Sequence, residues 1–221
     1  MHFANIDAVL FDMDGTLVDS EPLSWRAIEQ AFKMRGLTAE DHEPSAFHGV
    51  TWEAISVTLS STLPEESAPI TAEELQSVFH QLHITEPPNM IEGAQDALLR
   101  ARQSFPTAIC TSSHRQSLEA LLHRLRVLDL LPACVSAEDC TRSKPDPQGY
   151  RLAADRLKVS PGRCLVFEDS LAGVKAAQAA GMTVVAIVGE SGRGSAIAQE
   201  AHEAIANFTE LPDHFFESLR P

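Results

Sequence analysis

The chain has 221 residues, 44% of them hydrophobic, which suffices for one substantial domain or for a core that carries a smaller insert. Its formal net charge of −14, with no cluster of Lys and Arg to offset it, argues against binding to nucleic acid or to anionic membranes. The sequence shows neither the basic flank of a signal peptide nor an apolar run of membrane-spanning length. We therefore expect a soluble, cytoplasmic monomer with neither nucleic acid nor a membrane as its partner.

Short apolar runs that suit buried strands alternate with stretches of helical periodicity. Five of these runs are rich in branched side chains and lie at residues 6–11, 107–110, 133–136, 164–167 and 183–188, with a weaker one at 204–208. Apolar residues at helical spacing fill the intervals, as at Leu118, Leu121, Leu122 and Leu125. The alternation predicts an α/β fold, with a Rossmann-like parallel sheet covered by helices on both faces.

The interval between the first two predicted strands is too long for a simple crossover, and it predicts an inserted domain. Three helices are expected there, with apolar faces that begin at Trp25, Trp52 and Leu75. A capping box of Thr71 and Glu74 marks the start of the third helix. We therefore divide the chain into an α/β core of residues 1–19 and 88–221 and a helical cap of residues 20–87.

Two acids stand two positions apart directly after the first predicted strand, in the stretch FDMDGT. Because residues two apart on a strand point the same way, Asp12 and Asp14 can converge at the carboxyl end of the strand, where open parallel sheets bind ligands. Two close carboxylates repel, which raises one pKa or recruits a divalent cation. The alternative is a solvated turn with a helix cap, a common role for a short acidic pair.

Three later motifs favour the first interpretation. The stretch FDMDGTLVDS resembles the first motif of the haloacid dehalogenase superfamily, and the other motifs of that family follow in order, each after a predicted strand. The second matches Thr111 in AICTSS, the third Lys144 in SKPDP, and the fourth the acidic pair Glu168 and Asp169 in LVFEDS. Each motif alone is a weak signal, but the four together span nearly the whole chain.

The resemblance implies phosphoryl transfer, a reaction that is accelerated by positioning and by neutralising charge on the phosphoryl oxygens. Asp12 is then the nucleophile that forms an aspartyl phosphate, and Asp14 is the general acid and base. Thr111 would donate its hydroxyl to a phosphoryl oxygen. Lys144 would neutralise the phosphate and the nucleophile together.

The same resemblance implies Mg²⁺ as the cofactor. Its ligands would be Asp12, the backbone carbonyl of Asp14 and Asp169, and it would offset the repulsion between an anionic nucleophile and an anionic phosphate. Glu168 is left open as a further ligand or an outer partner. Ser170 is better explained as the cap of the following helix.

Within the superfamily, the chain is similar to the branch of β-phosphoglucomutases and sugar-phosphate phosphatases, with the cap segment FHGVTWEAI similar to one of that branch's motifs. The mutases place a His and an Arg where this cap has Ser24 and Trp52. A mutase must also hold a bisphosphate at both ends, yet the cap carries only three Lys and Arg against eleven acids.

We therefore expect hydrolysis of a small phosphorylated metabolite, a sugar or polyol phosphate. The alternatives are a phosphoglucomutase-like phosphoryl transferase and a non-catalytic protein that binds a phosphorylated metabolite. A dehalogenase is disfavoured, because Asp14 has no evident role in displacing halide.

Overall fold

The computed structural model describes residues 3, 5–47, 50–131, 133–189 and 195–219. Contacts divide the chain into two compact units. The core unit comprises Met1–Asp19 and Asn89–Pro221, and the insert unit comprises Ser20–Pro88. Among the described residues, no helix combines the length and the apolar character needed to cross a bilayer.

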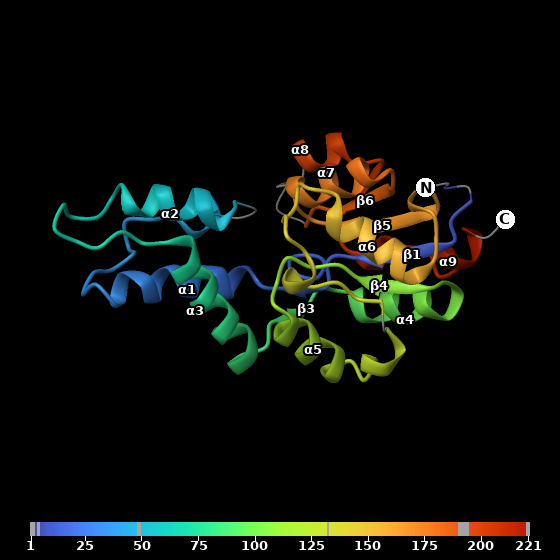
Figure 1. The fold of residues 1–221 in the computed structure, drawn as a ribbon, viewed down its shortest axis with the longest axis horizontal. Helices are drawn as coiled ribbons and strands as arrows, with labels where there is room; N and C mark the ends of the chain where they lie inside the picture. The colour runs from blue at the N-terminus through green and yellow to red at the C-terminus, as the bar shows by residue number, and fades with distance from the viewer. Residues whose placement is uncertain (1–2, 4, 48–49, 132, 190–194, 220–221) are drawn as a thin grey trace. The chain divides into compact units, whose positions relative to one another are not determined.

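A five-stranded parallel sheet forms the centre of the core unit (Figure 1). Its strands lie in the order β4 (Thr107–Ile109), β1 (Ala8–Phe11), β5 (Cys164–Glu168), β6 (Thr183–Ile187) and β7 (Glu203–Ile205). Every neighbouring pair in this sheet is parallel. The predicted α/β class with a parallel sheet is therefore confirmed.

Helices cover both faces of the sheet. One face packs against α4 (Ala94–Ser104), α5 (Arg115–Arg124) and α9 (Phe215–Ser218), and the other against α6 (Gln148–Leu157) and α7 (Leu171–Ala180), with α8 (Ser195–Glu200) beside α7. Alternate residues of β1 enter the two cores, Val9 and Phe11 on one face and Ala8 and Leu10 on the other. All four are fully buried, which explains why this strand is an unbroken apolar run.

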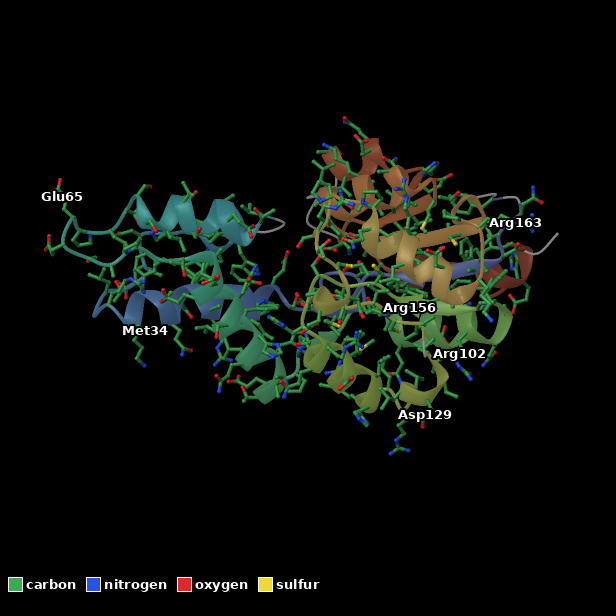
Figure 2. The ribbon with its side chains drawn as sticks, in the orientation of Figure 1. Met34, Glu65, Arg102, Asp129, Arg156 and Arg163 are labelled. Atoms are coloured by element: carbon green, nitrogen blue, oxygen red, sulfur yellow. The ribbon has the colours of Figure 1, made fainter. Side chains whose placement is uncertain are left out.

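The predicted strand at 133–136 is wrong in extent, because only one bridge, between Val135 and Cys110, joins this segment to the sheet. Its neighbouring backbone groups bond to side chains instead. Arg156 (Figure 2) donates to the carbonyl of Cys134 at 2.5 Å, and the N–H of Ser136 donates to Asp139 at 2.9 Å. The apolar side chains of 133–136 suit a buried strand, but the segment does not form a continuous set of hydrogen bonds with β4.

The end of the chain also differs from the prediction for 204–208. The strand β7 starts earlier and ends at Ile205, and Phe208 begins a 3₁₀ turn, η5 (Phe208–Glu210). A short antiparallel pair that the sequence did not indicate joins β2 (Val18–Asp19) to β3 (Asn89–Met90). This pair fastens together the two chain segments of the core unit that flank the insert.

The insert unit contains the three predicted helices, α1 (Glu21–Lys33), α2 (Trp52–Ser60) and α3 (Ala72–Thr85), with a 3₁₀ turn, η1 (Pro44–Phe47). The hydroxyl of Thr71 caps α3 by accepting from the N–H of Glu74 at 3.1 Å. The Glu74 carboxylate itself binds both terminal nitrogens of Arg35, at 2.7 and 2.8 Å. Arg35 also donates to backbone carbonyls at residues 31, 68 and 69, so it holds three segments of this unit together.

The network around Asp139 generates a stability prediction. Hydrogen bonds from Arg156, with further help from the Ser136 N–H and Arg115, outweigh partial burial and hold the pKa of Asp139 below its ordinary range. A lowered folded-state pKa stabilises the protein above the unfolded pKa of about 3.9, and this contribution is lost as pH falls below it. We expect Asp139→Asn to lower the free energy of unfolding by about 2 kcal/mol at pH 7 and by less at pH 3.

Urea denaturation of the wild type and the variant at both pH values measures this difference. Asp155→Asn, on the exposed face of α6, serves as the control and should change little at either pH. If the two proteins differ in free energy of unfolding by the same amount at pH 3 and pH 7, the stabilisation does not come from the ionised Asp139 carboxylate.

Candidate active site

Three neighbouring strands deliver the predicted site residues to one edge of the sheet. Asp12 follows β1, Thr111 lies just beyond β4, and Glu168 is the last residue of β5. The strand register pairs Phe11 with both Ile109 and Phe167, so the residues that follow lie next to one another. The sheet alone therefore brings together side chains that are far apart in the sequence.

Lys144 lies at the centre of this group, in the loop before α6. Its Nζ donates to Asp12 Oδ1 at 2.5 Å, to Glu168 Oε1 at 2.6 Å and to the Cys110 carbonyl at 3.2 Å. The ammonium also lies 5.0 Å from the ring centroid of Tyr150. Burial alone would lower the pKa of Lys144, but Asp12 and Glu168 raise it well above its ordinary value, so the side chain stays charged.

Glu168 is fully buried, and both of its carboxylate oxygens are occupied by hydrogen bonds. Oε1 accepts from Lys144 and, at 3.0 Å, from the hydroxyl of Tyr150. Oε2 accepts from the N–H groups of Asp169 and Ser170 and from the Ser170 hydroxyl, at 2.9 to 3.0 Å. Ser170 also caps α7, as predicted, by accepting from the N–H of Gly173. With these five hydrogen bonds, Glu168 anchors Lys144 and the residues at the start of α7.

Negative charge exceeds positive charge at this site. Asp12, Glu168 and Asp169 each offer a carboxylate oxygen, and these atoms lie within 4.8 Å of one another. Burial, together with the neighbouring carboxylates, raises the pKa of Asp12 to about 7 and that of Asp169 well above its ordinary value, despite Lys144. Such a set of hard oxygen donors with surplus charge fits a divalent cation. Both oxygens of Glu168 already accept hydrogen bonds. Asp12 and Asp169 are therefore the carboxylates that fit as ligands of the cation.

Asp14 lies in a tight turn and faces different partners. Gly15 adopts φ of +82°, and a side chain there would overlap the Asp169 carboxylate, so the turn requires glycine. Asp14 Oδ2 accepts from the Ser113 hydroxyl at 2.6 Å and lies 3.4 Å from the Thr111 hydroxyl. Asp12 and Asp14 are therefore neighbours in sequence with separate environments, one beside a cation and one beside neutral hydroxyls.

Sequence reasoning missed two residues of this arrangement, Ser113 and Tyr150. The run of three hydroxyl residues in CTSS was the available signal for Ser113, but it did not show which hydroxyl meets Asp14. Tyr150 stands at helical spacing with Ala153 and Ala154, which indicates an apolar helix face, and its ring is indeed buried. A pocket opens beside Lys144 and Thr111, between the loop at 137–146 and the start of α6.

This chain is similar to a known family of hydrolases and to several proteins named as phosphatases. A family model described as haloacid dehalogenase-like hydrolase matches residues 6–181. Validoxylamine A 7'-phosphate phosphatase from Streptomyces hygroscopicus subsp. limoneus is 33% identical over 196 residues, which cover 80% of this chain and 84% of that protein. Hexitol phosphatase A from Escherichia coli is 36% identical over 180 residues, which cover 80% and 81%.

A solved structure extends the likeness to the fold. The crystal structure of β-phosphoglucomutase from Clostridium difficile has a TM-score of 0.71 and 20% identity, and the match covers 96% of each chain. The family match and the relatives named as phosphatases support phosphatase activity. The chain belongs to the haloacid dehalogenase-like hydrolase family.

The surplus of buried negative charge predicts a stabilising response to Mg²⁺. In EDTA at pH 8, Asp169→Asn should melt at a higher temperature than the wild type, because desolvation and the neighbouring carboxylates raise the pKa of Asp169 and disfavour its charged form, which an amide does not adopt. Added Mg²⁺ should raise the melting temperature of the wild type and have little effect on the variant.

Thermal denaturation followed by circular dichroism measures both effects. Asp213→Asn, an exposed acid of the core unit, should keep the wild-type response to Mg²⁺. An equal rise for the wild type and Asp169→Asn would show that the cation binds elsewhere.

Proposed function

We propose that this chain is a Mg²⁺-dependent phosphatase that hydrolyses a small phosphomonoester, a sugar or polyol phosphate, through an aspartyl phosphate on Asp12. The observation that carries the proposal is the division of labour between two adjacent carboxylates. Asp12 is buried at a strand end against Lys144, and Asp14 is half-buried against hydroxyl groups. Two acids in contrasting environments at one edge of a sheet suit a nucleophile and a proton-transfer group.

In the first half-reaction, an oxygen of Asp12 attacks phosphorus, and the bond to the ester oxygen breaks. Asp14 gives its proton to the departing oxygen. In the second half-reaction, Asp14 takes a proton from water as the water oxygen attacks phosphorus and releases Asp12. Lys144 holds Asp12 in place and offsets charge on the phosphoryl group, and the Thr111 hydroxyl donates to one of its oxygens.

Asp12 and Asp169, together with the Asp14 backbone carbonyl, are the groups proposed to hold Mg²⁺. When bound, the cation would supply charge neutralisation between the carboxylate nucleophile and the anionic phosphate. The fit rests on the surplus charge and on the close carboxylate oxygens described above. Glu168 is not proposed as a ligand of the cation. Its role is to hold Lys144 in position.

The insert unit is proposed as the cap that carries substrate contacts, and its charges favour a monophosphate. Its only Lys and Arg residues are Arg26, Lys33 and Arg35. Arg26 forms an ion pair with Glu86, and Arg35 binds Glu74 through two hydrogen bonds. Trp52, which stands where the mutases have a cap Arg, packs on Phe79 at 5.4 Å between ring centroids. Residues 48 and 49 of the cap motif lie outside the described residues.

A second phosphate would therefore find two of these three cations already committed to carboxylates. The net charge of −14 likewise supports a small soluble substrate over nucleic acid or a membrane. The proposal places the enzyme in the cytoplasm as a monomer. Relatives named as phosphatases of a hexitol and of a 7'-phosphate agree with a polyhydroxylated monophosphate as substrate.

The nucleophile can be tested directly. Asp12→Asn should lower the rate of phosphate release from p-nitrophenyl phosphate by at least about 10³-fold, because an amide cannot form the aspartyl phosphate. Asp129→Asn, on the surface of the core unit (Figure 2), is the control and should retain wild-type activity. A folded wild type that binds Mg²⁺ but releases no phosphate from any ester of a metabolite panel would favour the binding-protein alternative.

The mutase alternative has its own test. With glucose 1-phosphate as substrate, we expect inorganic phosphate to form faster than glucose 6-phosphate, because the insert unit has few uncommitted cations to hold a bisphosphate intermediate. Coupled assays for the two products on one sample measure the ratio. Faster formation of glucose 6-phosphate, with or without a bisphosphate primer, would establish the mutase activity instead.

A further inference from the structure

We infer that Ser113 is a positioning residue for the proton-transfer carboxylate of Asp14, an inference that rests on the proposed phosphatase function. The contact between the Ser113 hydroxyl and Asp14 Oδ2 measures 2.6 Å, within the normal range for a hydroxyl donor. The Thr111 hydroxyl lies 3.4 Å from the same oxygen, beyond that range. Ser113, rather than the threonine of the second motif, therefore makes the effective contact with this carboxylate.

The backbone of Ser113 is fixed on both sides, which gives the hydroxyl a defined position. Its N–H donates to Thr111 Oγ1 at 2.9 Å, and its carbonyl accepts from the N–H of Ala137 at 3.0 Å. Ala137 starts the 3₁₀ turn η3 (Ala137–Asp139), whose N-terminus is closed by reciprocal bonds between Ser136 and Asp139. The Thr111 N–H in turn donates to Val135 at 3.0 Å. Ser113 is thus held by the sheet edge and by the Asp139 network.

A hydroxyl suits both protonation states that the reaction requires of Asp14. It can donate to the ionised carboxylate and accept from the protonated acid by rotation about one bond. In the first half-reaction the P–O bond to the leaving group breaks, and the proton of Asp14 passes to the departing oxygen. A correctly placed acid matters most when the leaving oxygen is strongly basic, and little when it departs readily as an anion.

This dependence on the leaving group supplies the experiment. kcat/KM is measured with phenyl phosphate, p-nitrophenyl phosphate and 2,4-dinitrophenyl phosphate, because it reports the steps up to cleavage of the ester bond. We expect Ser113→Ala to lower kcat/KM about tenfold for phenyl phosphate and less than about twofold for the dinitrophenyl ester. The dinitrophenyl ester then also verifies that the variant is folded and competent.

Two further variants sharpen the test. Ser113→Thr keeps a hydroxyl and should restore most of the activity on phenyl phosphate. Ser112→Ala removes the neighbouring hydroxyl, which is exposed and has no hydrogen bond among the described residues, and should follow the wild type on all three esters. A uniform loss over the three esters, or no loss with any, would overturn the positioning role while leaving the phosphatase function intact. Failure of the wild type on every ester would instead refute the proposed function.

Discussion

The structure is organised around a surplus of buried negative charge at one edge of a parallel sheet. Asp12, Glu168 and Asp169 converge there, and Lys144 is the cation that the described residues supply to them. Burial makes such charges costly unless they are paired and hydrogen-bonded. Much of the surrounding sequence therefore serves to hold this cluster. The Tyr150 hydroxyl and the N–H groups of Asp169 and Ser170, just before α7, donate to Glu168, and Gly173 leaves the space that the Glu168 carboxylate occupies.

The two acids of the first motif show how one strand end can support two kinds of chemistry. Asp12 continues the strand direction into the buried cluster, where a lysine orients it and where a cation would complete the charge balance. Asp14 belongs to the turn that Gly15 permits, and it meets hydroxyl groups from the next strand's loop. The hydroxyl contacts of Asp14 are neutral, whereas Asp12 accepts from the ammonium of Lys144.

The sequence predicted those features that depend on local pattern. The strands at the centre of the sheet, the insert helices and the Ser170 cap follow from apolar periodicity and capping residues, which act over a few positions. The segment 133–136 shows the limit. Its side chains form an apolar run that suits a strand, but the N–H of Ser136 donates instead to Asp139, three residues further along, in a capping box. The Cys134 carbonyl accepts from Arg156, which approaches from α6 and which no local pattern reveals. The same holds for Ser113 and Tyr150, whose roles depend on contacts with distant residues.

The insert unit uses its charges in a way that bears on substrate choice. Arg35 ties α1 to the start of α3 and to the preceding loop, and Arg26 pairs with Glu86 near the end of the unit. These arginines are occupied in building the unit. Under the proposed function, affinity for a phosphorylated metabolite would come chiefly from the phosphoryl site proposed for the core unit, with polar or apolar contacts discriminating the remainder of the substrate. A neutral, hydroxyl-rich leaving group agrees with the proposed function, because it demands no second anion site and its alcohol would need the proton that the proposal assigns to Asp14.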